Sequence, residues 1–277
     1  MLSRLPLRAQ YRLGDWLGFV VRNTPNQISK QARANIELCF TGSDPAERQR
    51  LYLESVRHTC YSMTELAALW CWPIERVLAL VGTTDVCPEF EASTRGRIIL
   101  APHLGSWETL VLWLGRACNA IILYKRRENR RLDEFIKQAR SRSGGSPVPT
   151  QKSGLRRLLV GLKEGRSLMI LPDQRPGGKK AFIESRFFGF DAPTTTLVYS
   201  LCSKVDCDVF IATMYRVDPA GGFGLRIEPL KHEHLVADES GSAQYMNDEI
   251  ERRVRLYPEQ YQWGYHRFKS TVFQSMP

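Results

Sequence analysis

The segment RIILAPHLGSWETLVLW (residues 97–113) joins a short apolar run to a longer stretch in which apolar residues recur at helical spacing. This pattern predicts a buried strand over residues 97–101 and a helix over residues 106–117. Similar strand patterns occupy 120–124, 167–171, 208–217 and 223–230, and helix patterns occupy 44–73, 131–142, 153–165, 195–204 and 240–256. Strands that alternate with helices predict an α/β fold with a mixed central sheet covered by helices.

The composition is that of a folded chain with a basic surface. The 277 residues are 43% hydrophobic, which is enough to build a sizeable core. The formal net charge of +10 indicates an anionic partner: nucleic acid, an anionic membrane surface, or an acidic protein or substrate. Because the chain carries no signature motif of a nucleic-acid-binding family, we expect no nucleic acid among its partners.

The cysteines favour a reducing compartment. Seven are present, an odd number, and none forms a CxxC pair, which argues against a disulfide framework and against a zinc ribbon. His232 and His234 could hold a metal, but the sequence shows no third ligand near them. We therefore expect no metal site and no cofactor.

The first 30 residues form a candidate membrane-associating segment, which precedes a single domain over residues 31–277. The segment has neither the features of a signal peptide nor the ~20 apolar residues that span a bilayer. Its apolar residues, Trp16 and Phe19 among them, are interspersed with arginines. Two interpretations stay open: a helix in a membrane interface whose arginines face lipid phosphates, or a helix packed on the domain core.

His103 and Glu108 are the first candidate catalytic residues. His103 lies just past a predicted strand, and Glu108 falls near the first turn of the following helix, which Ser106 can cap. If the chain turns at Gly105, the Glu108 carboxylate can reach the imidazole, fix its tautomer and favour the imidazolium that forms when His103 takes a proton. Taken alone, the stretch also fits a loop histidine with a surface glutamate.

Asp173 occupies the matching position after the predicted strand over residues 167–171. Its ordinary role would be in a turn or cap. However, polar residues at the ends of two core strands indicate a shared site, because functional groups of α/β folds gather past the strand ends. No serine or cysteine stands in a nucleophile motif, so a histidine base would act on a substrate nucleophile such as an alcohol.

The segment after Asp173 is predicted to be an irregular basic loop. Its sequence RPGGKK (175–180) could hold phosphate through Arg175, Lys179 and Lys180, or it could be a solvated loop. Four phenylalanines accompany it: Phe182, Phe187, Phe188 and Phe190. Aromatic and basic residues together could bind nucleic acid, or the aromatic rings could wall an acyl chain.

Five segments together resemble the bacterial lipid A late acyltransferases, of the lauroyl and myristoyl transferase type, within the wider lysophospholipid acyltransferase group. They are ARANIELCF (32–40), the H-x4-E motif of His103 and Glu108, LPDQRPG (171–177), the phenylalanine- and glycine-bearing segment with APTTT, and YPEQYQWGYHRFK (257–269). The H-x4-E motif alone is weakly specific, but all five in this order are strongly specific. The resemblance extends over the whole chain.

The resemblance implies transfer of a fatty acyl group from an acyl carrier protein thioester to a hydroxyl of a lipid A precursor. His103 and Glu108 match the family's catalytic dyad. Arg140 matches a family arginine by its spacing after Tyr124, and Asp173 matches the aspartate after the third strand. We assign these last three residues and Arg175 to substrate binding.

Two departures from the family pattern concern the ends of the chain. The N-terminal segment is shorter and less hydrophobic than the family's usual membrane anchor, and GYHRFK replaces a terminal histidine-arginine-arginine run. We expect the protein at the cytoplasmic face of the inner membrane, on an anionic membrane surface. The alternatives are an acyltransferase for another membrane lipid, such as an ornithine lipid, glycolipid or lysophospholipid, or a non-catalytic basic module that binds membranes or nucleic acid.

Overall fold

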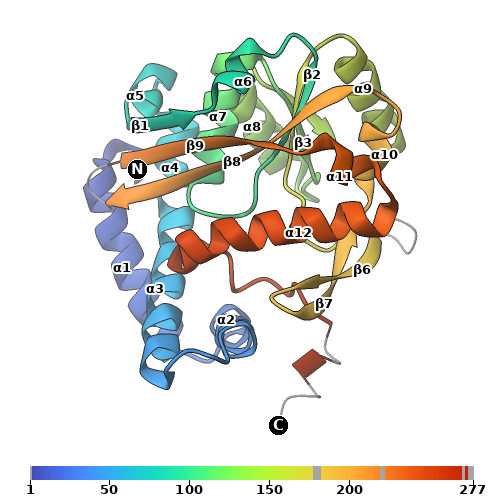
Figure 1. The fold of residues 1–277 in the computed structure, drawn as a ribbon. Helices are drawn as coiled ribbons and strands as arrows, with labels where there is room; N and C mark the ends of the chain where they lie inside the picture. The colour runs from blue at the N-terminus through green and yellow to red at the C-terminus, as the bar shows by residue number, and fades with distance from the viewer. Residues whose placement is uncertain (1, 177–181, 219–221, 270–271, 274–277) are drawn as a thin grey trace.

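The computed structural model describes residues 2–176, 182–218, 222–269 and 272–273. Its centre is a seven-stranded sheet with the order β1-β9-β8-β2-β5-β3-β4 (Figure 1). The strands are β1 (Val81–Val86), β2 (Gly96–Leu100), β3 (Ile121–Tyr124), β4 (Ser146–Pro149), β5 (Ser167–Ile170), β8 (Cys207–Asp218) and β9 (Gly222–Leu230). Neighbouring strands are parallel except in the β8–β9 pair. The predicted mixed α/β sheet is confirmed.

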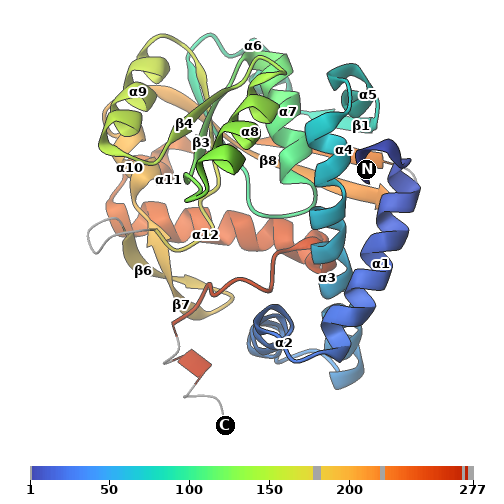
Figure 2. The same cartoon turned by 180° about the vertical axis from the view of Figure 1, so that it is seen from behind.

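Helices lie on both sides of this sheet (Figures 1 and 2). The helices among the described residues are α1 (Leu7–Asn23), α2 (Gln27–Cys39), α3 (Pro45–Thr64), α4 (Leu66–Cys71), α5 (Ile74–Leu78), α6 (Pro88–Ala92), α7 (Trp107–Cys118), α8 (Arg130–Ser141), α9 (Lys152–Lys163), α10 (Leu197–Cys202), α11 (His232–Val236) and α12 (Glu239–Leu256). Short 3-10 turns, η1 (Leu2–Arg4) and η2 (Pro258–Gln260), precede α1 and follow α12.

Strand β2 shows why both faces of the sheet are covered. Successive side chains of a strand point to opposite faces. Ile98 and Leu100 join a buried cluster with residues of α9, α10 and α12, whereas Ile99 joins a second cluster with residues of α4 and α7. A strand that is buried on both faces consists mainly of consecutive apolar residues, as residues 97–101 do.

The predicted central strands correspond to β2, β3, β5, β8 and β9, each within one or two residues. The two edge strands were not predicted. β1 is polar and mostly exposed, and β4 contains Pro147 and Pro149, which an edge strand tolerates because one side needs no hydrogen bonds. The segment expected to be an irregular loop also contains a hairpin, β6 (Phe182–Phe187) and β7 (Phe190–Thr195). The helix predicted over residues 44–73 is interrupted at Glu65.

Helix α1 packs on α3 through one face and exposes the opposite face. The buried face includes Leu7, Tyr11 and Gly14, and a Cβ atom on Gly14 would lie 2.6 Å from the Tyr61 ring. Trp16 is 60% exposed on the other side. Helix α1 therefore packs on the rest of the protein through one face and also exposes apolar side chains on the opposite face. No helix among the described residues has the length and hydrophobicity needed to cross a membrane.

Candidate active site

The site lies where the neighbouring parallel strands β2 and β5 end. Leu100 pairs with Ile170 at the carboxyl ends of these strands. His103 and Asp173 each follow three residues later, so the two segments leave the sheet side by side. This edge of an α/β sheet is the usual place for a binding or catalytic site.

The Asp173 carboxylate holds His103 at two points. The backbone amide of His103 donates to Oδ2 at 2.8 Å, and Nδ1 of the imidazole lies 2.8 Å from Oδ1. Burial alone would raise the pKa of Asp173, but the nearby imidazole and its hydrogen bonds lower the pKa below its usual value. An ionised carboxylate can only accept, so Nδ1 carries a proton, and in the neutral imidazole Nε2 has the lone pair.

The side chain of Glu108 points to a different partner. This second residue of α7 accepts hydrogen bonds from Nε1 of Trp70 at 3.2 Å and from Nε of Arg140 at 3.1 Å, and it also contacts Nη2 of Arg140. Burial would raise the pKa of Glu108, but the Arg140 guanidinium outweighs burial and lowers it. The expectation that Glu108 contacts the imidazole is corrected, because the strand order brings Asp173 to that position.

Arg140 and Tyr124 form the neighbouring part of the site. The Arg140 guanidinium lies 5.9 Å from the centre of the Tyr124 ring, and the Tyr124 hydroxyl donates to Asp133 at 3.3 Å. Arg140 is largely buried in its ion pair with Glu108. The Nη1 atom of Arg140 forms no hydrogen bond within the described residues, whereas Nε and Nη2 both contact Glu108.

The candidate residues in the segment after β5 differ in what they contact. The carboxylate of Asp173, which was assigned to substrate binding, holds His103. The Arg175 side chain is exposed, and its backbone amide donates to the Tyr265 hydroxyl at 2.9 Å. Lys179 and Lys180 lie outside the described residues.

Two of the four phenylalanines of the same region are buried in the core. Phe187 and Phe188 are 1% and 7% exposed, and their rings lie against Tyr261 and Trp263. They support the C-terminal segment. Apolar surface near the site instead comes from Trp107, whose ring centre is 5.2 Å from that of His103, and from Phe135 beside Trp70.

A tight turn connects His103 to α7. Gly105 has a φ of +63°, and a Cβ atom there would lie 2.1 Å from the Met214 carbonyl oxygen, so glycine is required. Ser106 occupies the position before the helix, but its side chain does not cap the helix. The hydroxyl donates to Glu65 at 2.8 Å, which attaches the turn to the end of α3.

The C-terminal segment supports this turn from the other side. The amide of Gly105 donates to the Gln260 carbonyl at 3.0 Å, and the amide of Gln262 donates to the His103 carbonyl at 3.1 Å. The Asn35 side chain in turn donates to the carbonyls of Trp263 and Tyr265 at 2.7 and 2.8 Å. Two sequence segments noted above only for their resemblance, 32–40 and 257–269, therefore support the loop that carries His103.

Comparison with known proteins places this chain in a family. The sequence model described as bacterial lipid A biosynthesis acyltransferase matches residues 1–270. The chain belongs to this family. Within the bacterial lipid A biosynthesis acyltransferases, the palmitoleoyltransferase of Escherichia coli K12 is 29% identical over 269 residues, which are 96% of this chain and 87% of the relative. The lauroyltransferase of the same organism is 25% identical over 274 residues, 98% of this chain and 88% of the relative.

Family membership confirms the resemblance seen in the sequence and identifies the chain as an acyltransferase of lipid A biosynthesis. The alternative of a non-catalytic basic module is thereby set aside. A further relative, the lipid A biosynthesis myristoyltransferase of Escherichia coli K12, is 24% identical over 260 residues, 91% of this chain and 77% of the relative. The names of the three relatives specify three different acyl groups, so the family accommodates more than one chain length.

Proposed function

We propose that this acyltransferase moves a fatty acyl group from an acyl carrier protein thioester to a hydroxyl of a lipid A precursor, with Nε2 of His103 as the general base. The observation that carries the proposal is the contact between Nδ1 of His103 and the ionised Asp173. It leaves Nε2 to accept a proton, and the carboxylate stabilises the imidazolium that results.

In the proposed reaction, Nε2 takes the proton of the acceptor hydroxyl as its oxygen attacks the thioester carbonyl carbon. The tetrahedral intermediate then collapses, the C–S bond breaks, and Nε2 returns the proton to the departing sulfur. The products are an ester and a free thiol. The first turn of α7, which has no side-chain cap, presents backbone amides that could stabilise the negative oxygen of the intermediate.

Glu108 and Arg140 have a separate role in this proposal. Glu108 fixes the guanidinium through Nε and Nη2, which leaves Nη1 of Arg140 to donate to an anionic group of the donor or acceptor. Arginine suits a phosphate because its planar fork presents several donors in a fixed geometry. Arg140, Tyr124 and Arg175 therefore remain our candidates for substrate binding.

Thioester consumption tests the reaction and its donor. Purified enzyme is incubated with an acylated acyl carrier protein, or with the matching acyl coenzyme A, and with a lipid A precursor in mixed micelles. We expect acceptor-dependent release of the carrier thiol and a product heavier by one acyl group in mass spectrometry. Ornithine lipid, a glycolipid and a lysophospholipid serve as alternative acceptors. Faster turnover with any of these acceptors would contradict the proposed substrate.

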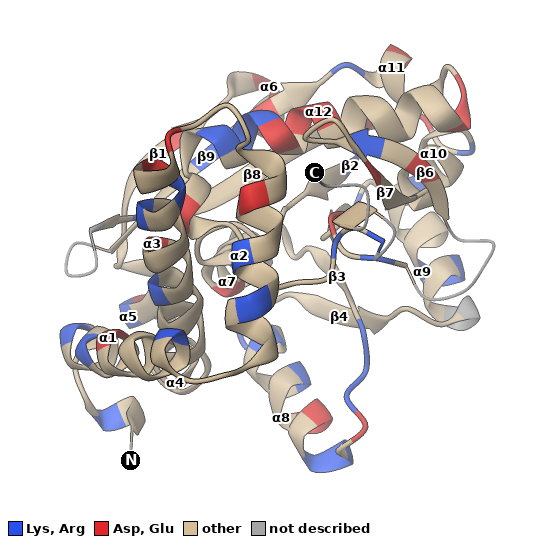
Figure 3. Cartoon of the chain, turned by 90° about the horizontal axis from the view of Figure 1, so that it is seen from below, with Lys and Arg blue, Asp and Glu red and all other residues tan. Residues whose placement is uncertain are grey.

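We also propose that the enzyme works at the cytoplasmic face of the inner membrane, with α1 on the membrane surface. Arg8, Arg12, Trp16 and Phe19 follow one another at spacings of four, four and three residues, which places them on one exposed face of α1. Trp16 and Phe19 are 60% and 55% exposed. Figure 3 shows basic residues on α1, α2 and α8 on the side seen from below. Aromatic residues flanked by arginines suit an anionic lipid interface.

Vesicle binding tests this placement. We expect the full-length protein to bind phosphatidylglycerol vesicles at low salt and to be partly released at high salt, because salt screens the arginines more than it weakens apolar insertion. Replacing Trp16 and Phe19 together with glutamine should lower binding by roughly tenfold or more, since burial of one such side chain contributes about 1.5–3 kcal/mol.

The matched control for that experiment is Leu256→Gln, which changes a side chain of similar exposure (49%) at the end of α12. It should leave vesicle binding unchanged. Equal binding by the Trp16/Phe19 variant and the wild type would show that α1 does not make the membrane contact. A wild-type protein that stays in solution beside anionic vesicles would rule out the placement altogether.

A further inference from the structure

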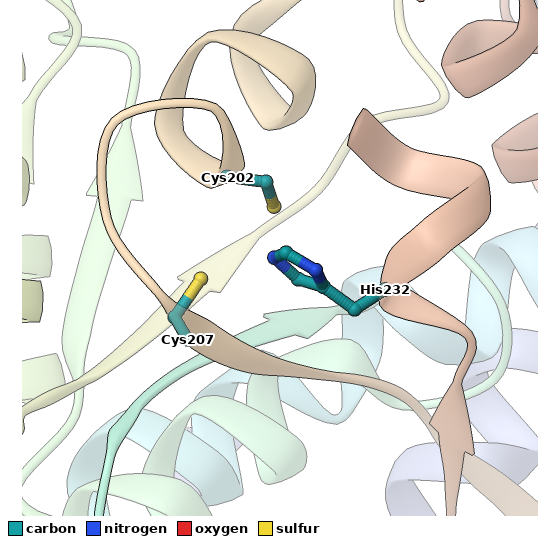
Figure 4. A group of neighbouring side chains, drawn as sticks. All are labelled: Cys202, Cys207 and His232. Carbon is teal, nitrogen blue, oxygen red and sulfur yellow. The ribbon is translucent and has the colours of Figure 1, made fainter. Parts of the chain in front are cut away.

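Two cysteines and a histidine converge at a site that the acyl-transfer reaction does not use. Cys202 ends α10, Cys207 begins β8, and His232 begins α11. Their ligand atoms all lie within 4.8 Å of one another, and Figure 4 shows the imidazole turned toward the two sulfurs. Both cysteines are buried, with exposures of 4% and 0%.

The fold holds the three residues together from different elements. The short connection between α10 and β8 is closed by amides of Lys204 and Val205, which both donate to the Leu201 carbonyl at 3.1 Å. His232 comes from the far end of β9, the strand that pairs with β8. The two histidines noted in the sequence face different partners, because His234 faces the Tyr245 ring at 4.8 Å while His232 faces the cysteines.

An unpartnered polar atom marks the cluster as incomplete. Within the part of the chain that the structure describes, Nε2 of His232 is buried without a hydrogen-bond partner. Buried polar atoms are nearly always paired, because an unpaired one loses its hydration without compensation. A cation bound between this nitrogen and the two sulfurs would supply the missing partner.

We propose that Cys202, Cys207 and His232 bind a zinc ion. Thiolate and imidazole are the preferred ligands of Zn²⁺, at distances of about 2.3 Å for Zn–S and about 2.0–2.1 Å for Zn–N. Ligand atoms within 4.8 Å of one another reach those distances with small side-chain movements. Two thiolates, a neutral imidazole and Zn²⁺ carry no net charge, which suits a buried position.

The fourth position of the proposed tetrahedron is left to water. The carboxylates that flank Cys207 have other partners: Asp206 accepts from Arg95 at 2.6 Å, and Asp208 accepts from Ser93 at 2.7 Å. Three protein ligands and a water are the coordination of open zinc sites, whereas structural sites usually have four protein ligands.

The location of the cluster separates the proposed zinc from the acyl-transfer reaction. Cys207 pairs with Gly96 at the amino end of β2, whereas His103 follows the carboxyl end of the same strand. The five residues of β2 separate the two ends by roughly 13 Å, at about 3.3 Å per step along the strand. Zinc would thus join α10, β8 and α11 near the amino ends of β2 and β8. The candidate active site lies past the carboxyl end of β2.

Metal analysis of the full-length protein tests the site. The protein is purified under reducing conditions without a metal-affinity step, loaded with zinc or cobalt, and freed of excess metal by gel filtration. We expect about one zinc per chain by elemental analysis, and with cobalt the visible and near-ultraviolet bands of tetrahedral thiolate coordination. Cys202→Ser, Cys207→Ser and His232→Gln should each reduce the bound metal to background. Cys71→Ser and His234→Gln are matched controls that should keep it.

If a variant fails to fold, thiol alkylation of the wild-type protein still tests the proposal. Zinc should slow modification of Cys202 and Cys207 but not that of the exposed Cys71, and removal of zinc should lower the melting temperature. Absence of bound metal after loading, or equal metal in the His232→Gln protein, would overturn the proposal. So would a Cys202–Cys207 disulfide that persists under the reducing conditions. None of these measurements depends on acyl transfer.

Discussion

Replacement of His103 with alanine is expected to lower the rate of acyl transfer by at least roughly 10²–10⁴-fold, the usual contribution of a general base. The fold should persist, because the backbone amide of residue 103 still donates to Asp173 and the amide of Gln262 still donates to the carbonyl of residue 103. Initial rates of thiol release, compared at equal protein concentration with thermal unfolding curves, measure both effects.

Two further variants distinguish the roles of the carboxylates. Asp173→Asn keeps the shape of the side chain but removes the charge that stabilises the imidazolium, so we expect a lower kcat with little change in KM. Glu108→Gln weakens the hold on Arg140, so we expect a higher KM for the anionic substrate. His266→Ala, at an exposed position, is the control and should behave as the wild type. Wild-type turnover by a folded His103→Ala enzyme would end the general-base proposal.

Replacement of Glu65 with alanine should produce the largest loss of stability, about 3–5 kcal/mol, because it leaves a buried arginine without its counterion. Glu65 and Arg216 are 1% and 3% exposed, and they pair through Nε at 3.0 Å and Nη2 at 2.6 Å. The same carboxylate accepts from the hydroxyls of Tyr11 and Ser106, each at 2.8 Å. Glu65 therefore connects α1, β8 and the turn before α7.

Urea unfolding at neutral pH measures this effect. If the alanine variant does not fold, Glu65→Gln, which keeps some hydrogen bonds, should show a smaller loss in the same direction. The double variant Glu65→Leu with Arg216→Met should recover part of the stability, since no buried charge remains. The control is Glu134→Ala, which breaks an exposed pair with Lys137 and should cost no more than about 1 kcal/mol. A similar cost for both alanine variants would contradict the assigned role of the buried pair.

The centre of the fold could be predicted from the sequence alone. Largely apolar runs such as residues 97–101 and 167–171 belong to strands that are buried on both faces. Polar side chains are disfavoured at such positions, so the strands can be found from the sequence. The same pattern placed His103 and Asp173 just past strand ends. The ordered segments that resemble lipid A acyltransferases indicated the family, which the comparison confirmed.

The contacts between side chains could not be predicted in the same way, because they depend on the arrangement of the strands in the sheet. Glu108 is five residues from His103 in the chain, but Asp173 is the residue that contacts the imidazole, because β5 lies beside β2 in the sheet. The cluster of Cys202, Cys207 and His232 likewise depends on the pairing of β8 with β9. Strand order is set by the packing of the whole core rather than by spacing along the chain. Sequence patterns therefore located His103 and Asp173, whereas the contacts of these residues and the cysteine–histidine cluster followed only from the assembled sheet.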